Sequence, residues 1–319
     1  MTEAFRQGRV VSITGERSTV SSAGKEYSCV LRKKAKGEKS KQKNILVVGD
    51  IVQFFLEKDT EGVIEKIEER KSYLTRQDTV QKKNQILAAN VDQVLITVSV
   101  VNPPLKLPLI DRYLIACEKG NLSPILVINK IDLLNDTSYT ENIIEKENLL
   151  YKEALFAYEQ IGVPVCPVSA KKDEGLNALK KLMKGKTSVF SGQSGTGKSS
   201  LINAIFQTDL LVNAPIKRTR KGAHTTTRAT LVPLKDEGFV VDTPGIKSFG
   251  IWELTKEDII EHFTDIKEIG RGCRFSDCMH MKEPGCKVAE AIVEKKLSSL
   301  RFDSYLSLIE SIGKKDRWR

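Results

Sequence analysis

The sequence lacks an apolar run long enough to span a lipid bilayer, and residues 1–5 do not begin a secretory signal. It also lacks a lipidation motif, an internal repeat and a low-complexity segment. These absences argue against integral membrane and secreted proteins, so we expect a cytoplasmic protein without a membrane partner. The chain of 319 residues is 40% hydrophobic and 29% charged, which suits two or three small cores.

Acidic residues are outnumbered, with 41 Asp and Glu against 51 Lys and Arg and a formal net charge of +10. This balance favours polyanionic partners, with nucleic acid ahead of a membrane surface. Residues 32–43 contain seven basic residues and one acidic residue. We expect them to contact RNA phosphates, with little base selectivity because the segment has no aromatic residue. A merely solvated loop is the alternative, and residues 314–319 form a weaker basic segment.

A glycine-rich segment near the middle of the chain matches the phosphate-binding P-loop. It follows a short β-run at residues 187–190 and precedes an amphipathic helix expected over residues 198–206. Backbone N–H groups of such a turn approach phosphate oxygens, and the helix N-terminus favours negative charge. Lys198 should act in catalysis by reaching the β- and γ-phosphates, and Ser199 should bind Mg²⁺. The nucleotide-contacting residues expected here are Gly192, Gln193, Ser194, Gly195, Thr196, Gly197, Lys198, Ser199 and Ser200.

A second motif, which would read the base, directly follows an apolar strand at residues 124–128. It consists of Asn129, Lys130, Ile131 and Asp132. A carboxylate at Asp132 accepts hydrogen bonds from the ring N–H and the exocyclic amine of guanine, whereas adenine offers no matching donor pair. Asn129 would hold the ring edge, and the stem of Lys130 would pack on the nucleotide. The motif therefore predicts selection of GTP over ATP.

Downstream, Ser169 and Ala170 end another apolar strand, where the backbone N–H of Ala170 could meet the guanine O6. A helix-capping turn is the ordinary alternative for an Asn-Lys-x-Asp sequence. Both segments, however, end predicted strands, which is where doubly wound sheets bind their ligands. We therefore expect both segments to contact GTP or GDP.

A third element of the nucleotide site follows the apolar strand at residues 239–241. Asp242 is the expected partner of Mg²⁺, and the backbone N–H of Gly245 should contact the γ-phosphate. By itself, the Asp-Thr-Pro-Gly sequence predicts only a β-turn. Because the P-loop follows the guanine-reading motif instead of preceding it, the complete set indicates a circularly permuted GTPase.

The expected switch loop at residues 222–227 contains a His-Thr-Thr-Thr sequence. Thr226 is favoured narrowly over Thr225 as the residue that binds Mg²⁺, because sequence alone cannot set the register. Ile246 occupies the position where many GTPases place the glutamine that orients the attacking water. His224 is the best internal replacement, with a solvated loop histidine as the alternative. Hydrolysis by the isolated protein should be slow, at roughly 10⁻⁴ to 10⁻² s⁻¹, which implies an activator.

Three of the six cysteines crowd with a histidine into one segment: Cys273, Cys278, His280 and Cys286. Four soft ligands without an open position predict one structural Zn²⁺. Disulfides are the competing interpretation, which a reducing cytosol and the intervening histidine disfavour. The other cysteines stand singly in apolar surroundings and are expected to be buried packing residues: Cys29, Cys117 and Cys166.

The fold class expected from the pattern is α/β. Short β-runs at 8–13, 18–20, 26–31, 50–55 and 63–67 suggest a small barrel of the OB type in residues 1–75, which would bind RNA. Strands then alternate with helices, which predicts a doubly wound parallel sheet and a circularly permuted P-loop GTPase domain over residues 76–250. Residues 251–319 should form a helical zinc-binding domain.

These residues and their order resemble the circularly permuted small-ribosomal-subunit-dependent GTPase A family, also called YjeQ or RsgA. The resemblance covers nearly the whole chain, since that family also carries an N-terminal OB domain, a His-Thr-Thr loop and a C-terminal zinc-binding domain. It implies hydrolysis of GTP stimulated by the small ribosomal subunit, contact with its rRNA, and a role late in its assembly. We expect a monomer.

Two other classes of function remain open from the sequence. An RNA-binding module could use GTP only as a structural ligand, which predicts binding without turnover. A metabolic nucleotide kinase could use the P-loop for transfer to a small acceptor, although the guanine-reading motif argues against it.

Overall fold

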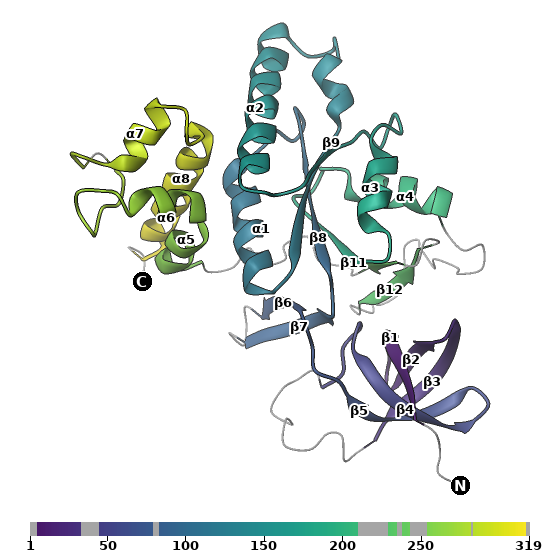
Figure 1. Cartoon of the computed structure of the whole chain (residues 1–319). Helices are drawn as coiled ribbons and strands as arrows, with labels where there is room; N and C mark the ends of the chain where they lie inside the picture. The colour runs from purple at the N-terminus through teal and green to yellow at the C-terminus, as the bar shows by residue number, and fades with distance from the viewer. Residues whose placement is uncertain are drawn as a thin grey trace.

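The computed structural model describes residues 5–32, 45–78, 83–209, 229–234, 238–242, 254–281 and 283–316. Figure 1 shows an N-terminal barrel, a central sheet flanked by helices, and a C-terminal group of helices beside those on one face of the sheet. Expected features at residues 33–44, 210–228 and 243–253 lie outside the described residues.

The first five strands close into a barrel in the order β1-β2-β3-β5-β4. They are β1 (Arg6–Thr14), β2 (Arg17–Ser22), β3 (Lys25–Leu31), β4 (Ile51–Lys58) and β5 (Glu61–Ile67). Alternate residues point inward, so that Val10, Val20, Phe54 and Ile64 are completely buried. Closure leaves these short strands without free edges, and it confirms the predicted N-terminal barrel.

A hairpin that the sequence did not predict connects the barrel to the central sheet. It pairs β6 (Tyr73–Asp78) with β7 (Lys83–Ala89) in a separate two-stranded sheet. Polar residues are frequent in both strands, so neither shows the apolar alternation that marks a half-buried strand. The expected domain boundary between residues 75 and 76 falls inside β6.

The central sheet has the strand order β10-β9-β8-β11-β13-β12 and is parallel except for β12. Its strands are β8 (Gln93–Ser99), β9 (Ser123–Asn129), β10 (Val165–Pro167), β11 (Thr187–Ser191), β12 (Thr230–Pro233) and β13 (Phe239–Asp242). The helices that connect them are α1 (Leu107–Lys119), η2 (Ile131–Asn135), α2 (Glu141–Gln160), α3 (Leu176–Met183) and α4 (Lys198–Asp209). The predicted α/β fold is therefore confirmed.

Both faces of this sheet are covered, as Figure 1 shows with α1 and α2 on one side and α3 and α4 on the other. In β8, Val94 and Ile96 pack in the core beneath α1 and α2, whereas Leu95 packs in the core beneath α3 and α4. Side chains of a strand alternate between faces, so a strand covered on both sides reads as a continuous apolar run.

Within the described residues, four helices follow the sheet: α5 (Lys256–His262), α6 (Thr264–Gly270), α7 (Lys287–Val293) and α8 (Ser299–Asp316). The first of them begins at a capping box, in which Thr255 and Asp258 satisfy each other's backbone N–H groups. These helices share a core of their own, which Ile115 of α1 joins. Among the described residues, none of the helices has the length and apolar character needed to cross a membrane.

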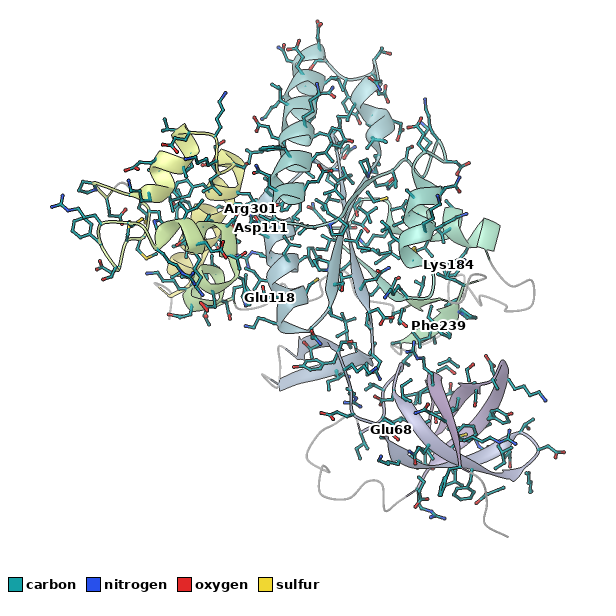
Figure 2. All side chains as sticks on the ribbon, viewed as in Figure 1. Glu68, Asp111, Glu118, Lys184, Phe239 and Arg301 are labelled. Atoms are coloured by element: carbon teal, nitrogen blue, oxygen red, sulfur yellow. The ribbon has the colours of Figure 1, made fainter. Side chains whose placement is uncertain are left out.

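A buried ionic cluster attaches this C-terminal group to α1 (Figure 2). Arg301 of α8 forms an ion pair with Asp111 of α1 and donates two hydrogen bonds of 3.1 Å to Asp265 of α6. The side chains of Arg301 and Asp111 are 4% and 1% exposed. Burial disfavours the charge of Arg301, but the two carboxylates outweigh it and hold its pKa above the usual range. The Arg301 guanidinium also lies 4.3 Å from the ring centroid of Phe263.

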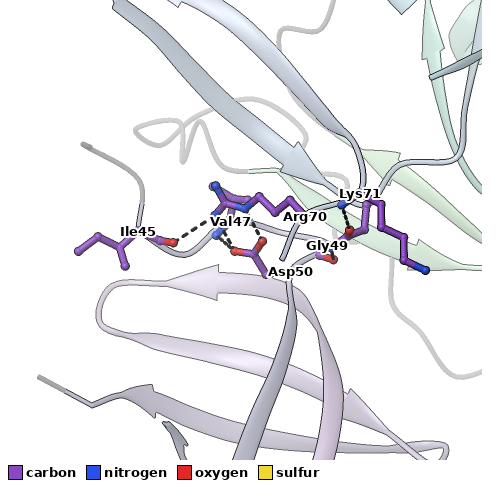
Figure 3. Close-up of polar contacts among 7 residues, drawn as sticks. Ile45, Val47, Gly49, Asp50, Arg70 and Lys71 are labelled. Carbon is purple, nitrogen blue, oxygen red and sulfur yellow. Dashed lines mark hydrogen bonds and ion pairs between the residues drawn. The ribbon is translucent and has the colours of Figure 1, made fainter. Parts of the chain in front are cut away.

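A second ion pair fixes the junction between the barrel and the hairpin (Figure 3). Asp50, which is completely buried, accepts hydrogen bonds of 2.7 and 2.9 Å from Arg70 and one of 2.8 Å from the backbone N–H of Val47. Arg70 also donates to the carbonyl oxygen of Ile45 at 3.1 Å. The chain at Ile45, just downstream of the basic segment, is therefore held against the linker that leads out of the barrel.

Replacing Arg301 by methionine should destabilise the protein severely, because Asp111 would keep its burial and lose its counter-charge. We expect a loss of about 3–5 kcal/mol in the free energy of unfolding, measured by urea titration. Lys296→Ala is the control, since its ion pair with Glu294 joins side chains that are 72% and 53% exposed. That change should cost less than about 1 kcal/mol. Equal, small losses in both variants would show that the buried cluster does not hold α8 in place.

Candidate nucleotide and metal sites

The P-loop lies at the centre of the sheet, at the carboxyl ends of its parallel strands. It leaves β11 after Ser191 and enters α4 at Lys198. The strand order reverses between β8 and β11, which are neighbours although β9 and β10 intervene in the sequence. Doubly wound sheets bind ligands at such a reversal.

Two glycines of the P-loop occupy places that no larger residue fits. A Cβ on Gly192, whose φ is +150°, would lie 2.0 Å from the carbonyl oxygen of Thr97. A Cβ on Gly197, whose φ is +88°, would lie 2.3 Å from Nδ2 of Asn129. At these two positions the loop is bare backbone that lies close to Thr97 and Asn129, as in the glycine-rich turns whose backbone N–H groups bind phosphate oxygens. This cradle fits the phosphates of a nucleotide.

Lys198 folds back over the P-loop. Its ammonium group donates hydrogen bonds of 2.6 Å to the carbonyl oxygens of Gly192 and Gln193. The hydroxyl of Thr196 donates to the same Gln193 oxygen at 3.0 Å. The positive charge is thus held directly above the loop, at the place where the terminal phosphates of a nucleotide would need it.

The guanine-reading motif and the P-loop are in direct contact. Asn129 is 1% exposed, and its side-chain amide donates to the carbonyl oxygen of Thr196 at 2.8 Å. The amide oxygen of Asn129 accepts a hydrogen bond of 3.2 Å from the backbone N–H of Ala170. One buried side chain therefore joins three segments that lie far apart in the sequence.

Asp132 is oriented by Ser169, whose hydroxyl donates to Asp132 Oδ1 at 2.6 Å. Ser169 is completely buried, and its oxygen also accepts from the backbone N–H of Lys172 at 3.1 Å. Ile131 begins the short helix η2 beside them. The structure thus brings together the predicted residues of both guanine-contacting segments.

Sequence reasoning missed the loop that follows β8. The side chain of Lys130, a residue with φ of +65°, reaches this loop and donates to the carbonyl oxygen of Asn102 at 2.6 Å. Partial burial lowers the pKa of Lys130, and Asp132 opposes that shift. The ring of Pro103 lies against Gly195 of the P-loop, 3.5 Å from where a Cβ would be. The Asn-Pro-Pro sequence after an apolar strand was the available signal for a turn at this edge.

The remaining predicted nucleotide contacts are only partly described. Ser199 and Ser200 lie in the first turn of α4, and the backbone of Asp242 ends β13 beside β11. The switch residues His224 and Thr226, like Gly245, lie outside the described residues.

The predicted zinc ligands converge in the C-terminal group of helices. The ligand atoms of Cys273, Cys278, His280 and Cys286 all lie within 4.8 Å of one another. The sulfur of Cys273 is 4.0 Å from that of Cys286 and 3.6 Å from Nδ1 of His280, and Cys286 Sγ is 3.5 Å from the same nitrogen. A tetrahedral zinc ion separates such ligand atoms by roughly 3.5–3.8 Å.

The chemistry of this cluster suits a metal better than a disulfide. All six cysteines are free thiols. Burial and the neighbouring thiols of Cys273 and Cys286 raise the pKa of Cys278 to about 12, so that adjacent thiolates require a cation. Burial lowers the pKa of His280, which favours the neutral imidazole that binds metals. The residues present therefore fit zinc. The three other cysteines are 0–3% exposed, which confirms them as packing residues: Cys29, Cys117 and Cys166.

The reversed motif order, the parallel sheet and the P-loop joined to a guanine-reading motif define a circularly permuted GTPase. The model of a protein family described as RsgA GTPase matches residues 67–252, which is more than half of the chain. The chain belongs to the RsgA GTPase family, a family of GTP hydrolases.

Individual relatives agree with this assignment. The chain is 36% identical to the Small ribosomal subunit biogenesis GTPase RsgA of Yersinia enterocolitica, with 96% of this chain and 85% of the relative covered. The crystal structure of YjeQ from Thermotoga maritima is similar with a TM-score of 0.74 at 33% identity, covering 97% of this chain and 99% of that one. The crystal structure of YloQ, a circularly permuted GTPase, matches with a TM-score of 0.71 at 30% identity, covering 98% and 96%.

Gly197→Ala should weaken guanine nucleotide binding by about ten-fold or more, because its Cβ would displace the Asn129 amide that joins the two motifs. Gly162→Ala is the matched control, since Gly162 has a similar φ of +75° but a Cβ there would meet no atom within 4 Å. Titration of both variants with a fluorescent GDP would show whether the loss is specific to Gly197 or accompanies alanine at any glycine with a positive φ. Equal affinities in the two variants would contradict the role given to the close approach.

Proposed function

We propose that this protein is a GTPase of small ribosomal subunit assembly, whose hydrolysis of GTP is stimulated by the subunit. The observation that carries the proposal is the buried contact between Asn129 and the P-loop, which joins a guanine-reading motif to a phosphate cradle in a circularly permuted chain. The name of the 36% identical relative supports the partner, and the net charge of +10 suits binding to rRNA. We place the protein in the cytoplasm as a monomer.

In the proposed site, the P-loop backbone from Gly192 to Ser200 holds the phosphates, and Lys198 meets the β- and γ-phosphates. Asp132 selects guanine, supported by the hydrogen bond from Ser169 at 2.6 Å. The Ala170 N–H lies beside them and donates to the amide oxygen of Asn129 at 3.2 Å. These contacts bind and orient GTP, and those to the base and the β-phosphate would also hold GDP once the γ-phosphate has left.

For the hydrolytic step we propose that Ser199, Thr226 and Asp242 hold Mg²⁺ and that Gly245 senses the γ-phosphate. Mg²⁺ supplies charge stabilisation of the transferring phosphoryl group when it is bound. His224 would orient the attacking water, since Ile246 cannot. A loop histidine can orient the water only when the loop itself is held in place. The isolated protein should therefore hydrolyse GTP slowly, and a partner that holds the loop should accelerate hydrolysis.

We propose a three-part division of labour along the chain. Residues 1–75 would contact rRNA through the barrel and the basic segment, residues 76–250 would bind and hydrolyse GTP, and residues 251–319 would form a zinc-stabilised helical domain. The ion pair of Asp50 with Arg70 supports the first assignment, because it anchors the chain at Ile45, just after the basic segment. Zinc would be held by Cys273, Cys278, His280 and Cys286.

The decisive experiment measures GTP hydrolysis by the purified protein with and without small ribosomal subunits. We expect strong stimulation by small subunits, with no comparable effect of large subunits and no turnover of ATP. An arginine finger supplied in trans accelerates other GTPases by about 10³–10⁵, which sets the range available to an activator. Tight GTP binding without turnover, even with small subunits present, would instead identify an RNA-binding module that uses GTP as a structural ligand.

The zinc assignment makes a separate prediction. The native protein should contain one zinc ion per chain by elemental analysis, and Cys273→Ser should lose it, because three ligands no longer close the tetrahedron. Cys166→Ala is the control, since this buried thiol lies outside the cluster and should leave the zinc content unchanged. Retention of zinc by the Cys273 variant would contradict the ligand set.

A further inference from the structure

The barrel is packed directly against the strands at one end of the central sheet. Figure 1 shows β1 beside β12. Val11 of β1 belongs to the same core as Leu231 of β12 and Val241 of β13, and Ile13 packs against that core. One face of β1 therefore fills the barrel, through residues such as Val10, while the other face joins the core of the GTPase sheet.

A single charged residue of β1 contacts the two strands that lead to the phosphate end of the site. The guanidinium of Arg9 donates a hydrogen bond of 2.5 Å to the hydroxyl of Thr187, the first residue of β11. Its central carbon also lies 5.4 Å from the ring centroid of Phe239, the first residue of β13. The backbone of Arg9 is fixed by pairing with Ser21 and Ile51 inside the barrel.

The residue that Arg9 contacts, Thr187, is itself held in place by the GTPase domain. Thr187 is 1% exposed, and its backbone N–H donates to the carboxylate of Asp92 at 2.7 Å while its carbonyl oxygen accepts from the Asp92 N–H at 2.9 Å. Burial lowers the pKa of Arg9, and Asp92 opposes that shift. Arginine remains charged under these conditions, so the Asp92 carboxylate balances a half-buried cation.

The strand that ends at Asp242 lies between β11 and β12. Within the described residues, β13 pairs with β11 at two positions, Thr187 with Phe239 and Ser188 with Val240. On its other side β13 pairs at all four of its residues with β12, the edge strand of the sheet, and Val240 and Val241 are buried in the cores of the two sheet faces. Asp242 comes three residues after Phe239, so at about 3.3 Å per residue the Arg9 contact lies roughly 10 Å from it along the strand.

We propose that Arg9 is a positioning residue for GTP hydrolysis, because it clamps the starts of β11 and β13 together and so sets the place of Asp242 relative to the P-loop. The barrel then helps to position a residue of the hydrolytic site, besides any contact that it makes with RNA. This inference rests on the Mg²⁺ role proposed above for Asp242.

The test compares Arg9→Met with Arg6→Met in the full-length protein. Arg6 lies on the same strand but bonds the hydroxyl of Tyr27 within the barrel at 3.0 Å, and within the described residues no hydrogen bond, ion pair or ring contact joins it to the sheet. The Mg²⁺ concentration for half-maximal hydrolysis should rise about three-fold or more in Arg9→Met, within the range of couplings measured between contacting residues. Affinity for GDP without Mg²⁺ should stay within about two-fold, since the P-loop and guanine contacts are untouched.

A second readout does not depend on activity. Amide hydrogen exchange over Phe239–Asp242 should be faster in Arg9→Met than in the native protein and unchanged in Arg6→Met. Phe239→Leu should reproduce a smaller part of the Mg²⁺ shift, and the two changes combined should be less than additive. If Arg9→Met folds poorly, Arg9→Lys keeps the charge and loses the planar stacking, so it should show an intermediate shift.

An unchanged Mg²⁺ requirement together with unchanged exchange in Arg9→Met would overturn the proposal, as would equal effects of Arg9→Met and Arg6→Met. Asp242→Asn separates this outcome from failure of the proposed function. If Asp242→Asn leaves the Mg²⁺ requirement unaltered, the metal role of Asp242 is wrong, and the exchange of β13 alone decides whether Arg9 clamps the strand.

Discussion

The side-chain amide of Asn129 is the interaction on which the nucleotide site depends. Its amide nitrogen donates to the Thr196 carbonyl of the P-loop, and its amide oxygen accepts from the Ala170 N–H after β10. The base end and the phosphate end of the site therefore share one connection. Gly197 must be a glycine because that amide occupies the space of its Cβ. Cutting and rejoining the chain elsewhere, as the permuted order requires, leaves this contact intact because it is made through space.

The permuted order changes which parts of the molecule lie next to β12 and β13, the strands beside the expected switch residues. β12 and β13 form one end of the sheet, where they meet the barrel through Val11 and Arg9. The C-terminal helices are fastened elsewhere, through Arg301 and Asp111 on α1. The barrel and the C-terminal helices thus contact the GTPase domain at separate places. The barrel meets the strands near Asp242, and the C-terminal helices meet α1, which begins shortly after Pro103, a residue that lies against the P-loop.

Much of the fold and site was predictable because the decisive signals are local. The P-loop, the guanine-reading motif and the zinc ligands each occupy a short run whose spacing is set by the chemistry of one ligand, and the buried strands read as apolar runs. The β6–β7 hairpin was missed because its polar strands lack a regular apolar alternation. The cluster of Asp111, Asp265 and Arg301 could not be found, since three ordinary charged residues far apart in sequence reveal nothing until the helices pack. The same holds for Arg9 and Thr187, which are 178 positions apart.

The distribution of the thiols has a practical consequence for labelling. Cys29, Cys117 and Cys166 are enclosed in the barrel and in the two faces of the sheet, and burial raises the pKa of each, that of Cys29 to about 11. Such thiols stay protonated and react slowly with alkylating reagents. The other three gather in one cluster with His280, where a bound metal would occupy their sulfur lone pairs. A cysteine introduced on the surface could therefore carry a spectroscopic probe in an otherwise native chain, and labelling at the cluster would report on how much of the protein carried no metal there.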